Sequence, residues 1–87
     1  MSNNLENKLH KFIADNIELV SEYESLDSTI PLEYCESDVV YLYKNIVKLN
    51  KNADFNTILK DALKNSIRTN IPITDSLESI MGSVSVD

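Results

Sequence analysis

Hydrophobic residues recur at helical spacing through the first third of the chain. Intervals of three and four positions place side chains on one face of an α-helix. A second apolar line, Ile13, Ile17 and Val20, widens that face, and Asn3 with Glu6 fits an N-terminal capping box. The pattern therefore predicts an amphipathic helix over about residues 3–25. The main series, which Asn16 interrupts, consists of Leu5, Leu9, Phe12, Leu19, Tyr23 and Leu26.

A second series begins after Pro31, a residue that suits the first turn of a helix. Its regular spacing predicts one helix over about residues 31–49. The pair Ser37–Asp38 could instead start a new helix, which would give a short helix followed by a longer one. The apolar members are Leu32, Cys35, Val39, Leu42, Ile46 and Leu49.

Two further helices are predicted in the second half of the chain. Asp54 is a good N-cap for an amphipathic helix over about 54–68. Thr74 or Asp75 would cap a short helix over about 75–82 that Gly82 ends. With a single glycine and two prolines, the chain lacks the regular turn signals of an all-β domain. We therefore expect one all-α domain over residues 1–87, a small bundle of three amphipathic helices plus a short C-terminal one.

The charges are divided unequally along the chain. Residues 12–43 contain eight acids and no lysine or arginine, whereas residues 44–69 carry a net charge of +4. Antiparallel helices could place these opposite charges beside each other within one molecule, where each exposed pair would contribute under about 1 kcal/mol. Alternatively, the acidic half could form a surface that attracts a basic partner.

Tyrosines accompany the acidic segment. Tyr23 and Tyr43 match the apolar series, so we expect them in the core, whereas Tyr34 and Tyr41 lie seven residues apart and off the Leu32–Leu42 line. Tyrosine offers a large contact area at low entropic cost and is frequent in interfaces. The candidate partner-binding residues are therefore Glu22, Glu24, Asp27, Glu33, Tyr34, Glu36, Asp38 and Tyr41.

Overall composition argues against several ligand classes. The net charge of −6 disfavours direct binding of nucleic acid or anionic lipid, because both require a surplus of basic residues. No apolar run approaches the roughly 20 residues that span a bilayer. The N-terminus lacks the apolar core of a secretory signal. We therefore expect a cytoplasmic protein without a membrane association.

Candidate catalytic groups do not assemble into a recognisable constellation. His10, the one histidine, lies between two lysines on the predicted polar side of its helix. Cys35 lies on the apolar series among acidic neighbours, and both burial and negative charge oppose thiolate formation. No glycine-rich phosphate loop is present. We therefore expect a non-enzymatic protein that needs no cofactor or metal.

Two short segments resemble motifs of known families. TDSLESI, residues 74–80, resembles the Asp-Ser-Leu motif of acyl and peptidyl carrier proteins, in which the serine bears a phosphopantetheine arm. That resemblance implies Ser76 as an attachment site, although carrier proteins place two further helices after the serine. NKNADFNTILKD, residues 50–61, is similar to an EF-hand calcium loop but has Phe55 where glycine is normal and Asp61 where glutamate is normal. Helix capping explains both segments.

Three function hypotheses follow. The first is a protein-binding module of the inhibitor, immunity or adaptor type, whose acidic surface around residues 22–43 engages a basic protein. The second is a structural homo-oligomer whose surface charge only confers solubility. Apart from this choice, we expect the chain to associate with a second copy or a partner, because the widened apolar faces of the first two helices are difficult to bury in a small monomer. The third is a carrier-like module that uses Ser76. For the first hypothesis we expect binding that weakens with salt.

Overall fold

The computed structural model describes residues 4–26 and 30–84, and these residues form helices without any strand. The expected all-α class is therefore confirmed for this part of the chain. Within the described ranges, the chain forms five α-helices and one 3₁₀ turn, where three helices and a short C-terminal one were expected. The elements are α1 (Asn4–Asp15), α2 (Ile17–Glu24), η1 (Leu32–Tyr34), α3 (Glu36–Leu49), α4 (Phe55–Thr69) and α5 (Ile73–Val84).

The first expected helix is in fact two helices, separated at Asn16. The backbone there leaves helical geometry, with φ −124° and ψ 41°. Both the backbone N–H and the side-chain amide of Asn16 donate to the Phe12 carbonyl, at 2.9 and 3.0 Å. A side chain that competes for a backbone carbonyl in this way favours a bend. The prediction of one helix over 3–25 is therefore wrong, and the Asn3 cap lies outside the described residues.

The second expected helix is also divided, because Cys35 adopts φ −127° and ψ 28° between η1 and α3. The prediction of one helix over 31–49 is wrong, and the alternative of a short helix followed by a longer one is closer. Most of the apolar series is nevertheless buried. Leu49 is the exception, with half of its surface exposed.

The last two helices begin where local chemistry favours them. The Asp54 carboxylate accepts hydrogen bonds from the backbone N–H and the hydroxyl of Thr57, at 3.0 and 2.9 Å. These bonds hold the pKa of Asp54 below its ordinary value. The predicted helix over 54–68 is confirmed to within one residue at each end. By contrast, α5 begins directly after Pro72 and continues past Gly82, so the predicted caps and the predicted end at Gly82 are wrong.

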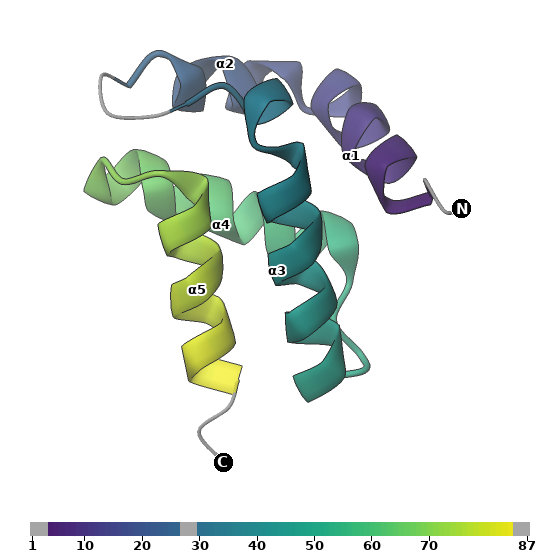
Figure 1. Cartoon of the computed structure of the whole chain (residues 1–87). Coiled ribbons are helices and arrows are strands. Elements are labelled where there is room, and N and C mark those ends of the chain that lie inside the picture. Colours follow the sequence, from purple (N-terminus) through teal and green to yellow (C-terminus); the bar gives the residue numbers. More distant parts are fainter. Residues whose placement is uncertain (1–3, 27–29, 85–87) are drawn as a thin grey trace.

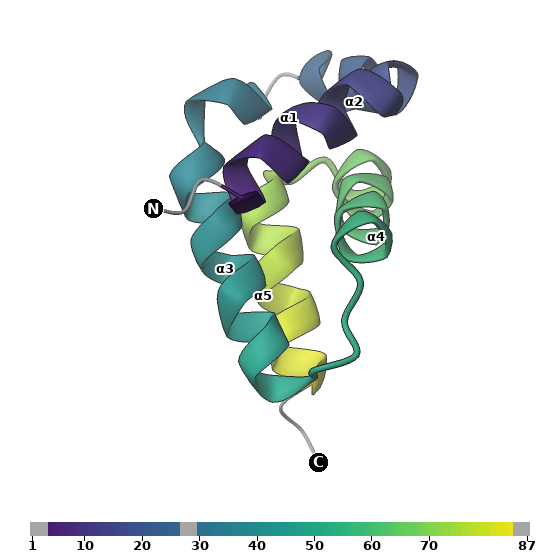
Figure 2. The same cartoon turned by 90° about the vertical axis from the view of Figure 1, so that its right-hand side faces the viewer.

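The helices are arranged so that α3 and α5 lie side by side and run in the same direction (Figure 1). The view turned by 90° shows α4 crossing beside this pair, while α1 and α2 cover the end where α3 and α5 begin (Figure 2). Phe55 packs edge-to-face against Phe12 and Tyr43, with ring centroids 6.5 and 4.9 Å away. The core therefore joins α1, α3 and the start of α4.

Burial of α1 and α2 occurs within the single chain. Leu9 and Phe12 of α1, and Val20 and Tyr23 of α2, are all at most 1% exposed. The bend at Asn16 turns both helices toward the core and leaves Ile17 54% exposed. The apolar faces that were expected to require a second copy are thus largely covered by the chain itself.

Candidate functional site

The two tyrosines expected on the acidic surface are exposed. Tyr34 in η1 is 80% exposed and Tyr41 in α3 is 65% exposed. Tyr23 and Tyr43 are buried, as their positions in the apolar series predict. The Tyr23 hydroxyl accepts a hydrogen bond from the backbone N–H of Ile73 at 2.8 Å, and that of Tyr43 donates to the Ala53 carbonyl at 3.2 Å.

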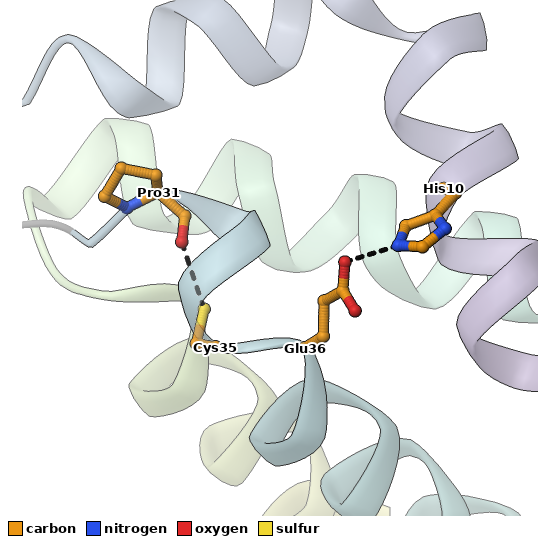
Figure 3. A network of polar contacts seen from close by, with 4 residues as sticks. All are labelled: His10, Pro31, Cys35 and Glu36. Carbon is orange, nitrogen blue, oxygen red and sulfur yellow. Dashed lines mark hydrogen bonds and ion pairs between the residues drawn. The ribbon is translucent and has the colours of Figure 1, made fainter.

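Two of the predicted surface acids bind other residues of the same chain. Glu24 accepts a hydrogen bond from the backbone N–H of Leu32 at 3.1 Å, which ties the end of α2 to η1. Glu36 Oε2 lies 2.5 Å from His10 Nε2 and joins the start of α3 to α1 (Figure 3). Both glutamates are half-buried. His10 is exposed, but it is not purely solvated as its sequence position suggested.

Three other predicted acids remain available to a ligand. Glu22, Glu33 and Asp38 are exposed. Asp27 lies outside the described residues. Within the ranges 4–26 and 30–84, the ion pairs join His10 to Glu36 and Lys11 to Asp15. The internal pairing between the acidic and basic halves, which antiparallel packing would provide, is therefore not found there.

The tertiary structure extends this surface onto α5. Asp38, Tyr41 and Leu42 of α3 line a hollow of about 340 Å³ together with Thr74 and Glu78 of α5. Asp38 of α3 and Glu78 of α5 thus line the same hollow as Tyr41. We call Glu22, Glu33, Tyr34, Asp38, Tyr41 and Glu78 the acidic surface. Thr74 and Glu78 were missed because nothing in the sequence pairs α3 with α5.

Positive charges lie on other parts of the same molecule. Lys44 and Lys48 follow Tyr41 on α3, and all three side chains are exposed. A second basic stripe on α4 consists of Lys60, Lys64 and Arg68, which are also exposed. None of these five cations pairs with a carboxylate among the residues that the structure describes.

Cys35 lies below the acidic surface and not on it. The residue is 9% exposed, and its thiol donates to the Pro31 carbonyl, with the sulfur 3.7 Å from the oxygen (Figure 3). Burial, reinforced by the carboxylates of Asp38, Glu24 and Glu36, raises the pKa of the thiol to about 11. The thiol therefore stays protonated at neutral pH and is a poor nucleophile.

The geometry does not favour the carrier-like hypothesis. Ser76 lies within α5 with no exposed surface. Its hydroxyl lies 2.6 Å from the Ser66 hydroxyl and accepts a hydrogen bond from the Asn65 amide at 3.0 Å. These contacts join α4 to α5 and keep the hydroxyl away from any transferase. Ser76 is a packing residue in this structure.

The remaining candidate sites are less organised. A hollow of about 400 Å³ near the start of α4 brings Lys8 and Lys11 close to Asp15 and Asp54. Some of these charged groups already have partners within the chain, since Lys11 pairs with Asp15 and Asp54 caps α4. Over residues 4–26 and 30–84, no group of three or more His, Cys, Asp or Glu side chains is placed to hold a metal ion.

Comparisons with known proteins add no relative. A scan against protein-family models gave no match, and searches of curated proteins and of solved structures gave none. None of the helices in the described part of the chain has the length and apolar character needed to cross a membrane.

Proposed function

We propose that this chain is a non-enzymatic protein-binding module, of the inhibitor, immunity or adaptor type, whose acidic surface engages a basic protein. The observation that carries the proposal is that the exposed carboxylates of Glu22, Glu33 and Asp38 form no ion pair with any residue in the described ranges 4–26 and 30–84. Charges that serve only to hold a fold together would be expected to meet their counterparts inside it. These acids instead face solvent together with Tyr34 and Tyr41.

Two kinds of contact would act together on such a surface. The carboxylates would attract a basic protein over a distance of about a Debye length, roughly 8–10 Å at physiological salt. The rings of Tyr34 and Tyr41 would then supply contact area and could accept a lysine or arginine over the ring face. Glu24 and Glu36 help to position this surface, because their contacts within the chain fix η1 and the start of α3.

The test compares two doubly reversed variants that change the net charge equally. The first, Glu33→Lys with Asp38→Lys, alters the acidic surface. The control, Glu18→Lys with Asp61→Lys, reverses exposed acids outside it. The wild type and both variants are immobilised and incubated with extract of the source cells at low and high salt. The proteins that remain bound are quantified by mass spectrometry.

We expect a basic protein that the wild type and the control retain at low salt, that the surface variant loses, and that high salt releases. Equal retention by all three proteins would contradict the proposal. Equal loss from both variants would also contradict it, since it would show a response to net charge alone.

A further inference from the structure

Two of the five large apolar side chains that are exposed in the described residues belong to the turn around η1. Tyr34, the last residue of η1, is 80% exposed, and Ile30, two residues before η1, is 55% exposed. Ile17, at 54%, is as exposed as Ile30 but lies alone at the start of α2. Single exposed apolar side chains are normal on protein surfaces. Ile30 and Tyr34 differ from Ile17 because they share one short segment, residues 30–34, that also carries the exposed carboxylate of Glu33.

Hydrogen bonds hold the backbone of this segment in place. The Tyr34 N–H donates to the Pro31 carbonyl at 2.9 Å, and the Cys35 N–H donates to the Leu32 carbonyl at 3.1 Å. The Cys35 thiol donates to the same Pro31 carbonyl (Figure 3). The Glu24 carboxylate accepts from the Leu32 N–H and thereby joins the segment to the end of α2. The turn is therefore fixed both by its own hydrogen bonds and by a contact to a neighbouring helix.

The inward and outward sides of the segment are clearly separated. Leu32 is fully buried and Cys35 is 9% exposed, so both hold the turn against the core. The Pro31 ring fixes its own φ, here −52°, and restricts the preceding Ile30 to extended backbone. Because this backbone is already ordered, Ile30 and Tyr34 would lose less conformational freedom on binding than side chains of a mobile loop.

We propose that this turn is the anchor of the partner interface. The side chains of Ile30 and Tyr34 enter an apolar pocket on the basic protein, and lysine or arginine side chains at the rim of that pocket pair with Glu33. The inference rests on the proposed function, since it uses the same acidic surface, and it adds a second property of the partner. The partner is thus a protein whose basic surface surrounds an apolar pocket.

Both parts of this chemistry follow from the exposed groups of the segment. Protein interfaces have an apolar core in which aromatic residues are enriched and a polar rim, and a few large side chains that fill pockets carry most of the binding energy. Tyr34 with Ile30 matches such a core. Glu33, exposed and without an ion pair in the ranges 4–26 and 30–84, matches the rim. Exposed ion pairs alone contribute little and are screened by salt. The apolar contact would therefore supply the part of the affinity that salt does not remove.

Peptide selection tests the anchor before the partner is identified. The immobilised wild type is exposed to a phage-displayed library of random peptides at physiological salt. The selected peptides are synthesised and titrated by calorimetry against variants whose fold is checked by circular dichroism. We expect sequences that combine aromatic or aliphatic residues with lysine or arginine. Tyr34→Ser and Ile30→Ser should each bind them at least about tenfold more weakly than the wild type. The control Ile17→Ser, which alters an equally exposed isoleucine, should bind within about twofold of the wild type.

The composition of the selected peptides separates this inference from the proposed function. Peptides that are basic but lack apolar residues, and that Tyr34→Ser still binds like the wild type, would overturn the anchor and leave the proposed function standing. Apolar peptides without basic residues that Tyr34→Ser loses would support the anchor and contradict a basic partner. The anchor is also overturned if no selected peptide depends on Tyr34 or Ile30, or if Ile17→Ser weakens binding as much as Ile30→Ser.

The order of the turn is tested at Glu24, a positioning residue that joins α2 to η1. Glu24→Ala removes the acceptor for the Leu32 N–H, whereas Glu24→Gln loses the charge but keeps a carbonyl oxygen that accepts hydrogen bonds. In Glu24→Ala we expect faster hydrogen exchange at the Leu32 N–H and at least about threefold weaker peptide binding, because the turn must then be ordered on binding. Glu24→Gln should restore both measurements to near wild-type values. If the two variants behave alike, the hydrogen bond does not position the turn, and the preordered anchor is overturned.

Discussion

The four tyrosines divide into two regions of opposite character, although all belong to or adjoin the same acidic segment. Tyr23 and Tyr43 lie in the core, where each hydroxyl pairs with a backbone group. Tyr34 and Tyr41 lie on the surface and expose most of their area. The difference shows that acidic neighbours in sequence do not decide the role of an aromatic residue. Its position on the helix and the elements packed above it decide that role.

The largest effect is expected from removing a core ring. Tyr23→Ala would leave a cavity between α2 and the start of α5 and would remove the acceptor for the Ile73 N–H. We expect the free energy of unfolding to fall by about 3–5 kcal/mol, as for other large aromatic truncations. Urea denaturation followed by circular dichroism measures it, with Tyr41→Ala as the surface control. Similar losses in both variants would remove the distinction between the two regions.

A smaller effect is expected when the core ring is kept and only its hydroxyl is removed. Tyr23→Phe leaves the buried Ile73 N–H without this acceptor, which should cost about 1–3 kcal/mol. Tyr43→Phe removes a donor to the Ala53 carbonyl, and we expect a cost of about 0.5–1.5 kcal/mol. The same denaturation experiment ranks the two. A larger loss of stability for Tyr43→Phe would show that the hydrogen bond between Tyr23 and Ile73, which joins α2 to α5, contributes less than the one between Tyr43 and Ala53.

Alkaline pH should weaken the core. Burial raises the pKa of Tyr23, of Tyr43 and, from 9.0 to about 11, of Cys35. Above about pH 9 the unfolded chain begins to lose these protons while the folded chain retains them, so the unfolded state is favoured as pH rises. Stability to urea should therefore fall between pH 9 and 11. Cys35→Ala should make this fall shallower, and an unchanged pH profile would contradict the assigned burial of the thiol.

The smallest effect on stability is expected at the surface. Tyr34→Ser with Tyr41→Ser should change the free energy of unfolding by no more than about 0.5 kcal/mol per site, because neither ring is buried. Capture of a basic protein should nevertheless decrease if these rings form part of the interface. A variant that is destabilised by several kcal/mol would show that the two rings belong to the core after all.

Local signals predicted some elements accurately and others poorly. The start of α4 could be predicted from Asp54, because the carboxylate of this N-cap accepts its hydrogen bonds from Thr57, three residues further along the chain. The divisions at Asn16 and Cys35 were harder to anticipate, because apolar residues continue at three–four spacing across both. Asn16 was visible as an interruption, but whether an asparagine in a helix faces solvent or binds a carbonyl depends on the packing of both flanking helices.

The candidate surface was likewise anticipated in part. The exposure of Tyr34, Asp38 and Tyr41 agrees with their positions off the apolar series. The engagement of Glu24 with η1 and of Glu36 with His10 could not be read from spacing, since residues far apart in the chain meet there. Glu78 was missed for the same reason, since it shares a hollow with Asp38 only because α5 runs alongside α3.

The sequence by itself determined the helical class, the main apolar positions and the separation of acidic from basic segments, because these follow from periodicity and composition. The tertiary structure decided which charges are paired, which tyrosines are covered and which side chains share a hollow. Those properties depend on contacts between distant segments, whose geometry is set by the bends at Asn16 and Cys35 and by the parallel packing of α3 and α5. Within the described residues, the structure thus divided the acidic segment into carboxylates that hold the fold, such as Glu24 and Glu36, and carboxylates that remain exposed, such as Glu33 and Asp38.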